Sequence, residues 1–412
     1  MTSADPLEWT RARTPILQSL QRDYADPKPF DGLRVAVASH LEYKTGVFIE
    51  TVRAAGATIL VTGSEPFSTV DSVVKWLDQD PGIHLFVEAD MDEEAWVAGQ
   101  HKLLEAEPDI ILDDGCQLIA KIHASHPEIA RDVIGGGEQT TAGVTRLEAM
   151  ADAGVLEFPV YAVNNTPMKR NFDNVHGTGE STLSNIQITT NTILSGSNVV
   201  VAGYGYCGRG IARKARGMGA KTTVTEVDPR RALEAHMDGH HVRPMAAAAP
   251  EADYVITATG SRDIVRREHI ERLPDGAILA NAGHFDVEIV VDDLTAMAER
   301  TSNPRPGITR YHLPDGRRIS LLAAGRLVNL TGPYSSGHPA AVMDTTFAMM
   351  FVAAHEFATD DPSIGPGVHR LPDRLDRQVA RRKLDATGIE IDVPTDSQKA
   401  YAEDWELDGD PF

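Results

Sequence analysis

Lys169 and Asp173, four residues apart, are the pair in this sequence best suited to moving a proton. They follow an apolar stretch at 158–163 that predicts a strand, and on a helical turn they would share one face. A lysine held against a carboxylate can act as a base toward a hydroxyl group. The alternative is an ordinary ion pair on a helix surface.

Three further polar residues follow predicted strands. His40 comes after the apolar run 33–38, and Asp113 and Asp114 come after 110–112. Ligands of parallel sheets bind at the carboxyl ends of the strands. His40 could therefore exchange a proton with a ligand, although a single histidine is more often structural.

Gly203, Gly205 and Gly208 form a G-x-G-x-x-G pattern between a β-branched run at 199–202 and a helical pattern. A second predicted strand follows and ends at Glu226. This context is typical of dinucleotide binding, with the pyrophosphate at a helix N-terminus. A carboxylate at Glu226 would accept hydrogen bonds from ribose hydroxyls and repel a 2′-phosphate, which favours NAD over NADP. The alternative is a glycine-rich turn in some other βαβ unit.

Strand and helix patterns alternate along both halves of the chain, which predicts parallel sheets covered by helices. Residues 301–306 read as a surface loop, and 135–143 as a glycine-rich segment. Residues 343–357 are apolar at helical spacing and are expected to rejoin the first half.

The chain has 412 residues, 42% of them hydrophobic and 24% charged, and a formal net charge of −21. This charge disfavours nucleic acid and anionic membranes as partners. With no apolar leader and no long apolar run, a cytoplasmic location is expected. The two cysteines, Cys116 and Cys207, give neither a disulfide framework nor metal-ligand spacing, so we expect packed thiols and no metal.

Several ordered blocks carry a family resemblance, among them HLEYKTGVFIE, EQTTAGV, KRNFDNVHGTGES, VVVAGYGYCGRG and NAGHFDVEI. They resemble S-adenosylhomocysteine hydrolase (adenosylhomocysteinase), in its short archaeal-type branch. The resemblance implies tightly bound, recycled NAD and transient oxidation of a ribose 3′-hydroxyl. Loss of the C4′ proton, elimination of the 5′-substituent, addition of water and re-reduction would follow.

The resemblance also implies roles for individual residues. Catalytic roles fall to Lys169, Asp173, His40 and His284. Substrate binding falls to Glu42, Lys44, Thr45, Gln117, Gln139 and His338, with His284 near the 5′-side and His338 over the base. NAD binding falls to Thr140, Thr141, Asn174, Gly203, Gly205, Tyr206, Cys207, Gly208, Glu226, Ser261, Asn281, Ala282, Gly283 and Asn329.

Four positions depart from the family pattern. Cys116-Gln117 replaces Gly-Asp, Gln139 replaces a glutamate, Asn165 replaces an aspartate and Ala324 replaces a glutamate. Because two of these changes remove carboxylates from the expected sugar pocket, one hypothesis is a nucleoside dehydratase. It would give a 4′,5′-unsaturated nucleoside of the kind found in angustmycin-type antibiotics. The alternatives are an ordinary S-adenosylhomocysteine hydrolase and an inactive NAD-binding regulatory homologue.

The expected fold is α/β, with two doubly wound parallel-sheet domains joined by a hinge. A flavodoxin-like substrate domain would comprise 1–178 and 339–372, and a Rossmann NAD domain 179–338. A tail at 373–412 would contact another subunit of a homodimer or homotetramer. The expected partner is a small-molecule nucleoside, with no nucleic acid and no membrane.

Overall fold

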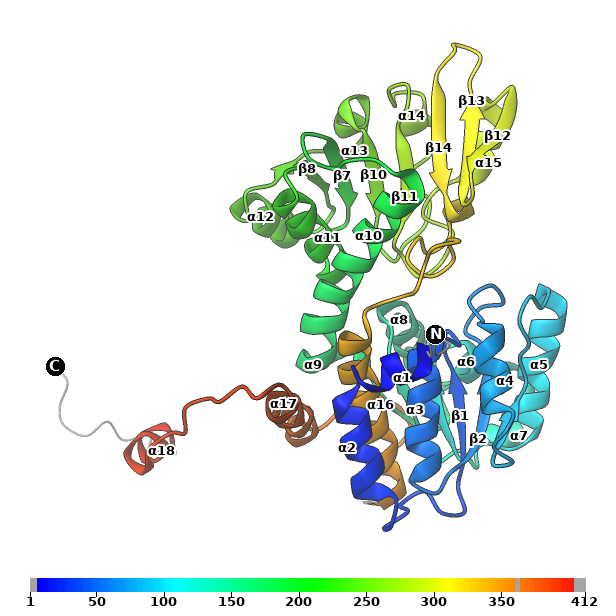
Figure 1. Cartoon of the computed structure of the whole chain (residues 1–412), viewed down its shortest axis with the longest axis vertical. Helices are drawn as coiled ribbons and strands as arrows, with labels where there is room; N and C mark the ends of the chain where they lie inside the picture. The colour runs from blue at the N-terminus through cyan, green and yellow to red at the C-terminus, as the bar shows by residue number, and fades with distance from the viewer. Residues whose placement is uncertain (1–5, 360–363, 404–412) are drawn as a thin grey trace, which may run out of the picture.

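The computed structural model describes residues 6–359 and 364–403. Two sheets, each covered by helices, form two lobes that face one another (Figure 1). We call residues 6–169 with 340–359 and 364–387 the first lobe, and residues 178–330 the second lobe.

The first lobe is built on a parallel sheet in the order β15-β6-β5-β4-β1-β2-β3. Its strands are β1 (Arg34–Ala38), β2 (Thr58–Thr62), β3 (Ile83–Leu85), β4 (Ile110–Asp113), β5 (Gly135–Glu138), β6 (Pro159–Tyr161) and β15 (Gly367–His369). The order reverses between β1 and β4, so the residues following these two strands meet at one point of the sheet edge.

Helices cover both faces of this sheet. They are α1 (Pro6–Arg11), α2 (Pro15–Tyr24), α3 (Tyr43–Ala54), α4 (Asp71–Leu77), α5 (Glu93–Glu105), α6 (Gln117–Ser125), α7 (Pro127–Ala130), α8 (Thr141–Asp152), α9 (Pro167–Lys169), α16 (Ala340–Thr359) and α17 (Asp373–Thr387). The Glu42 side chain caps α3, and the Thr140 side chain caps α8, by accepting from free backbone N–H groups.

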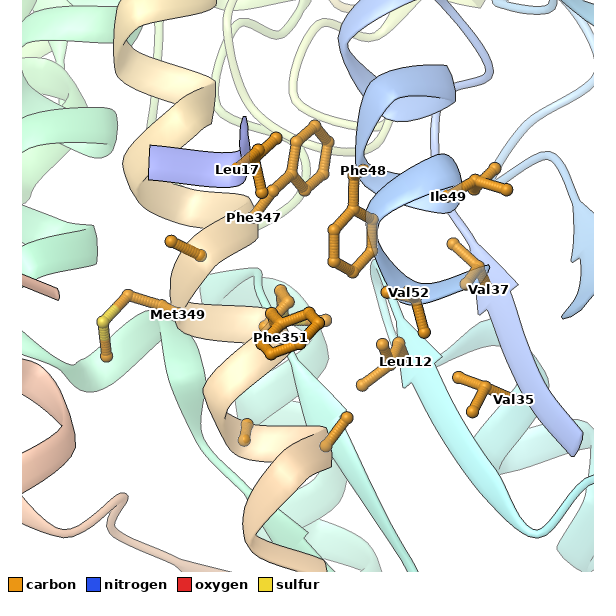
Figure 2. Close-up of a cluster of buried hydrophobic side chains, with 14 of the residues drawn as sticks. Leu17, Val35, Val37, Phe48, Ile49, Val52, Leu112, Phe347, Met349 and Phe351 are labelled. Carbon is orange, nitrogen blue, oxygen red and sulfur yellow. The ribbon is translucent and has the colours of Figure 1, made fainter. Parts of the chain in front are cut away.

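The core of the first lobe joins distant parts of the chain. Phe347 of α16 stacks on Phe48 of α3, with ring centroids 4.8 Å apart (Figure 2). Asp344, also on α16, accepts hydrogen bonds from the backbone N–H groups of Ile16 and Leu17 at the start of α2. The expected return of this helix to the first half is therefore confirmed.

The second lobe is built on a mixed sheet in the order β12-β13-β14-β11-β10-β7-β8-β9. Its strands are β7 (Asn198–Ala202), β8 (Lys221–Thr225), β9 (His241–Val242), β10 (Tyr254–Thr257), β11 (Ile278–Asn281), β12 (Arg300–Arg305), β13 (Ile308–His312) and β14 (Arg318–Leu322). Its helices are α10 (Thr178–Thr190), α11 (Tyr206–Gly217), α12 (Pro229–Met237), α13 (Met245–Ala248), α14 (Arg267–Ile270) and α15 (Val291–Met297).

Short helices of other types complete the chain. A π-helix, η2 (Arg170–Gly177), joins the lobes, and the 3₁₀ turns are η1 (Val163–Asn165), η3 (Ala249–Glu251) and η4 (Ala323–Gly325). The last described helix, α18 (Asp396–Glu403), extends away from both lobes (Figure 1). None of the helices in the described ranges is long and apolar enough to cross a membrane.

The doubly wound α/β class is confirmed, with two corrections. The first sheet has the order 3-2-1-4-5-6 rather than the flavodoxin order 2-1-3-4-5, because β3 pairs outside β2. Residues 301–306 are not simply a loop, because β12 pairs antiparallel with β13 and makes the second sheet mixed. The proposed domain boundaries stay predictions, and residues 404–412 of the predicted tail lie outside the described residues.

Candidate active site

A cavity of about 840 Å³ lies where the carboxyl ends of both sheets meet. Of the predicted site residues, those lining it are His40, Glu42, Thr45, Gln139, Thr140, Thr141, Lys169, Asp173, Asn174, Gly203, Gly205, Tyr206, Cys207, Glu226, Ser261, Ala282, Gly283, His284, Asn329 and His338. Lys44, Gln117, Gly208 and Asn281 do not line it. The structure therefore brings residues from most of the chain length to one cavity.

Lys169 and Asp173 are buried and joined, rather than forming a surface ion pair. The Lys169 Nζ donates to Asp173 Oδ1 at 2.8 Å and to Asn174 Oδ1 at 2.6 Å. The wider turn of the π-helix η2 contributes both acceptors, from the fourth and fifth residues after the lysine. The Asn174 amide in turn donates to Asn164 Oδ1 at 2.9 Å. One ammonium group is thus held by two acceptors at the cavity wall.

Asp173 has partners from two other segments as well. Its Oδ2 accepts from the Thr346 hydroxyl at 2.6 Å, and its Oδ1 lies 3.2 Å from His338 Nδ1. Burial alone would raise the pKa of this carboxyl group, but Lys169 and His338 lower the pKa well below its usual range. Asp173 is therefore ionised and tightly held.

His40 and Asp114 meet at the point where the strand order of the first sheet reverses. His40 Nε2 lies 3.8 Å from Asp114 Oδ2, and His284 Nδ1, from the second lobe, lies 3.9 Å from Asp114 Oδ1. The His40 Nδ1 is hydrogen bonded to the Ser68 hydroxyl at 2.7 Å. One carboxylate thus lies between two imidazoles that belong to opposite lobes.

The pKa of His284 is lowered to about 4. The main cause is burial, which disfavours the charged imidazole; Asp114 acts in the opposite direction. Electrostatic interactions with His40, Arg146 and Lys169 also lower the pKa of His284. His284 is therefore neutral near pH 7 and able to accept a proton.

Gln139 occupies the position of the missing family glutamate and points into this group. Its amide donates to Asp114 Oδ2 at 2.8 Å and to the Ser39 hydroxyl at 3.3 Å. Its Oε1 is buried and has no hydrogen-bond partner among the described residues. The preceding Glu138 is a buried brace, accepting from the backbone N–H groups of Gly115 and Cys116.

Three predicted residues lie behind the cavity wall. Lys44 Nζ is 2.8 Å from Glu42 Oε2 and donates to the Ser336 carbonyl at 2.6 Å. Gln117 donates to the Ser64 carbonyl at 3.2 Å. Gly208 has a packing position, because a Cβ there would lie 1.9 Å from the Gly203 carbonyl oxygen.

The glycine-rich turn opens onto the same cavity at the start of α11. Gly203 has a left-handed φ of 92°, and a Cβ there would lie 2.7 Å from the Ala258 carbonyl oxygen. A Cβ on Gly205 would meet only Arg231 within 4 Å, at 3.7 Å, which leaves room for a ligand. Glu226 accepts from the backbone N–H groups of Tyr204, Val227 and Asp228, so its carboxylate is fixed at the cavity.

Sequence reasoning missed two buried residues of the site. Asn164 donates to Thr141 Oγ1 at 3.1 Å and accepts from Asn174, linking two predicted segments. Glu288 binds the backbone N–H groups of Thr259 and Gly260, which line the cavity. The position of Glu288 within the family block NAGHFDVEI could have identified it as a site residue. Asn281, predicted to touch NAD, lies outside the cavity lining and braces Gly283 and Phe285.

The thiols also have packing environments. Cys116 is fully buried in the left-handed region, with φ of 57°, where the family pattern has glycine. Burial raises the pKa of both Cys116 and Cys207, so neither is an activated thiolate. No group of three or more potential ligands able to hold a metal ion occurs within the described part of the chain.

Comparisons with known proteins place these features in one family. Residues 5–127 match the model of S-adenosyl-L-homocysteine hydrolase, and residues 174–335 match the model of its NAD binding domain. The S-inosyl-L-homocysteine hydrolase of Methanopyrus kandleri is 45% identical over 403 residues, covering 98% of this chain and 94% of that protein.

Two further relatives carry the name adenosylhomocysteinase. That of Haloquadratum walsbyi (strain DSM 16854) is 48% identical, covering 97% of this chain and 92% of its own length. That of Thermococcus kodakarensis is 47% identical, covering 97% and 94% respectively.

The cavity fits NAD, the cofactor of this family. The helix N-terminus and the space at Gly205 suit a pyrophosphate, and the fixed Glu226 carboxylate suits ribose hydroxyls. Asn329 Oδ1 is buried without a hydrogen-bond partner among the described residues, and it is available to accept from the cofactor. The chain uses NAD, and it belongs to the S-adenosylhomocysteine hydrolase (adenosylhomocysteinase) family.

Proposed function

We propose that this enzyme hydrolyses S-adenosyl-L-homocysteine to adenosine and L-homocysteine by way of transient oxidation at the ribose 3′-carbon. The main observation behind this proposal is the buried Lys169–Asp173–Asn174 group. It shares one cavity with the dinucleotide fingerprint and with the His40–Asp114–His284 group. The names of the relatives support the same reaction.

Bound NAD supplies the reversible removal of hydride from the sugar. In its neutral amine form, Lys169 takes the proton of the 3′-hydroxyl and becomes an ammonium, since its Nζ lies at the cavity wall and is oriented by Asp173 and Asn174. Asp173 holds the ammonium and is itself fixed by Thr346 and His338. These contacts favour a lysine that is positioned before the substrate binds.

The second group serves the 5′-side of the sugar. His284, kept neutral by burial, can take a proton from water, and His40 can protonate the departing sulfur. Asp114 lies between them and stabilises whichever imidazole becomes charged. Gln139, with its unpartnered Oε1, accepts from a hydroxyl of the sugar.

The nucleoside dehydratase hypothesis is not confirmed, and the relatives favour hydrolysis. Its basis was the two glutamines. Gln139 has a local partner in Asp114, and Gln117 lies outside the cavity lining. Neither side chain therefore requires a different leaving group.

To test this proposal, the purified enzyme is incubated with S-adenosylhomocysteine, S-inosylhomocysteine or adenosine in separate reactions. Thiol release and the absorbance of reduced nicotinamide are followed, together with product masses. We expect homocysteine from the adenosyl substrate. Faster release from the inosyl substrate would assign the specificity of the M. kandleri relative. A nucleoside product lighter by one water would restore the dehydratase, and no reduction of NAD by any nucleoside would indicate the regulatory homologue.

We also propose that the enzyme is a homo-oligomer in which the end of the chain contacts a second copy. Ile389, Ile391 and Val393 lie between α17 and α18 and are 55%, 67% and 81% exposed. These alternating apolar side chains sit on a segment that leaves both lobes (Figure 1). Replacing all three with serine should lower the mass measured by light scattering; an unchanged mass would refute this contact.

A further inference from the structure

Arg146 on α8 contacts the chain neighbours of two site residues that lie on opposite lobes. Its Nη1 donates to the Gly115 carbonyl at 3.1 Å, directly after Asp114. Its guanidinium carbon lies 4.2 Å from the ring centroid of Phe285, directly after His284. Neither the sequence motifs nor the family resemblance assigns a role to Arg146.

The contact with Phe285 reaches the imidazole of His284. The two rings pack edge to face, with centroids 4.6 Å apart at 89°. Gly115 leaves space for the imidazole, because a Cβ there would lie 2.5 Å from His284 Nε2. Phe285 and Gly115 thus pack against the His284 imidazole, and Arg146 contacts both of them.

A planar guanidinium suits this double contact. It can stack on the electron-rich ring face while its edge donates to a carbonyl group, whereas a lysine ammonium is a point charge on a flexible stem. The interaction forms only when the lobes are together, because Arg146 lies on α8 of the first lobe and Phe285 lies between β11 and α15 of the second lobe.

We propose that Arg146 is a positioning residue that seats His284 against Asp114 when the lobes meet, and so serves the 5′-chemistry of the reaction. This inference rests on the proposed function. Arg146 acts through Phe285 and Gly115 rather than by touching the substrate, since it does not line the cavity.

Charge gives an independent readout of this role. Burial lowers the pKa of His284 most. Asp114 raises this pKa, and His40, Arg146 and Lys169 lower it. Loss of the Arg146 charge removes one influence that lowers this pKa, so the acidic limb of the rate profile should move to higher pH. Arg146→Lys keeps the positive charge but loses the stacking on Phe285. Its acidic limb should therefore stay at the wild-type pH, while its rate of homocysteine release should be lower.

The experiment uses full-length, NAD-loaded enzyme and separates two steps. Reduction of NAD by 5′-deoxyadenosine, which has no leaving group, reports 3′-oxidation. Homocysteine release from S-adenosylhomocysteine reports the whole reaction. Arg146→Leu should slow homocysteine release by about 100-fold while NAD reduction stays within about threefold of wild type.

Arg326→Leu is the matched control. Arg326 lies 4.2 Å over the ring of Phe67, a contact of the same kind that also joins the lobes but does not reach His284. It should leave the acidic limb unchanged. The proposal is overturned if Arg146→Leu releases homocysteine normally, if both steps fall together, or if Arg326→Leu shifts the limb equally. Failure of the wild-type enzyme in both reactions would instead overturn the proposed function.

Discussion

The two polar groups of the cavity are assembled in different ways. Lys169, Asp173 and Asn174 come from one continuous segment and are joined by hydrogen bonds of 2.6 to 2.8 Å. Asp114 and His284 come from separate lobes and lie 3.9 Å apart. The lysine and its two acceptors come from one segment, although Thr346 and His338 also hold Asp173, whereas the second group depends on how the lobes meet. Damage to the first should stop every step, and damage to the second should spare oxidation.

The largest effect is expected for Lys169→Met. It removes the base at the 3′-hydroxyl, and we expect a loss of about 10³-fold in both NAD reduction and homocysteine release. Stopped-flow absorbance of reduced nicotinamide measures the first step. Because Asp173 is left without its cation, far-UV circular dichroism should accompany the assay. Normal NAD reduction by a folded Lys169→Met variant would refute the proposed base.

His284→Gln should divide the two steps. Homocysteine release should fall by about 100-fold, because the proton acceptor on the 5′-side is lost. NAD reduction by 5′-deoxyadenosine should change by less than about threefold, since the Lys169 group is untouched. An equal loss in both assays would show that the two groups are not separable.

The same variant should change the dependence of stability on pH. The folded pKa of His284, about 4, lies below its ordinary value of 6.5. Between these values the unfolded chain binds a proton that the folded chain does not, so stability falls as the pH decreases. The free energy of unfolding, measured with urea, should decrease between pH 7 and pH 5 in both proteins. The decrease should be about 1–2 kcal/mol smaller for His284→Gln than for wild type. An identical loss in both proteins would contradict a depressed pKa.

Gln139→Glu should have a smaller effect. It replaces an amide that donates to Asp114 at 2.8 Å with a second carboxylate, and the two charges repel. We expect kcat/KM at pH 8 to fall by about tenfold and to recover at lower pH, where one proton shared between the two carboxylates relieves the repulsion. Gln139→Ala serves as the control, because it removes the hydrogen bond without adding charge. A pH-independent loss in Gln139→Glu would argue against repulsion.

Gln117→Asp should have the smallest effect. The side chain lies outside the cavity lining and contacts the Ser64 carbonyl. Steady-state kcat/KM should stay within about twofold of wild type, since this half-buried side chain lies away from the cavity and makes one hydrogen bond, to a backbone carbonyl. A shift in substrate preference would return this residue to the sugar pocket.

Much of this arrangement follows from local sequence. The β-branched run before Gly203 and the spacing to Glu226 predict a βαβ unit, and the structure has β7, α11 and β8 there. His40 and Asp114 were predicted at strand ends, and the reversal of strand order brings them together. Alternation of elements was sufficient to place them at one edge of a sheet.

Other features depend on packing between distant segments. Gly135, Gly136 and Gly137 lie in a glycine-rich segment for which the sequence predicts no strand, yet they form strand β5 in the interior of the first sheet. A Cβ on Gly135 would lie 2.5 Å from the ring of Phe357 on α16, so the bare strand makes room for that helix. Glycine disfavours strands locally, and only the tertiary contact explains its presence. Likewise, the four-residue spacing of Lys169 and Asp173 does not predict the π-helix η2 that follows Lys169.

The position of α16 has a consequence for the order in which the protein is made. The first lobe needs Phe347 in its core and β15 at its sheet edge, and both are translated after the whole second lobe. The second lobe is one continuous stretch and has its strands and core residues once residue 330 is made. A nascent chain stopped at residue 338 should therefore yield a protease-resistant fragment from its second half. Its first half should stay sensitive to protease, so the cofactor-binding lobe is ready before the lobe that precedes it.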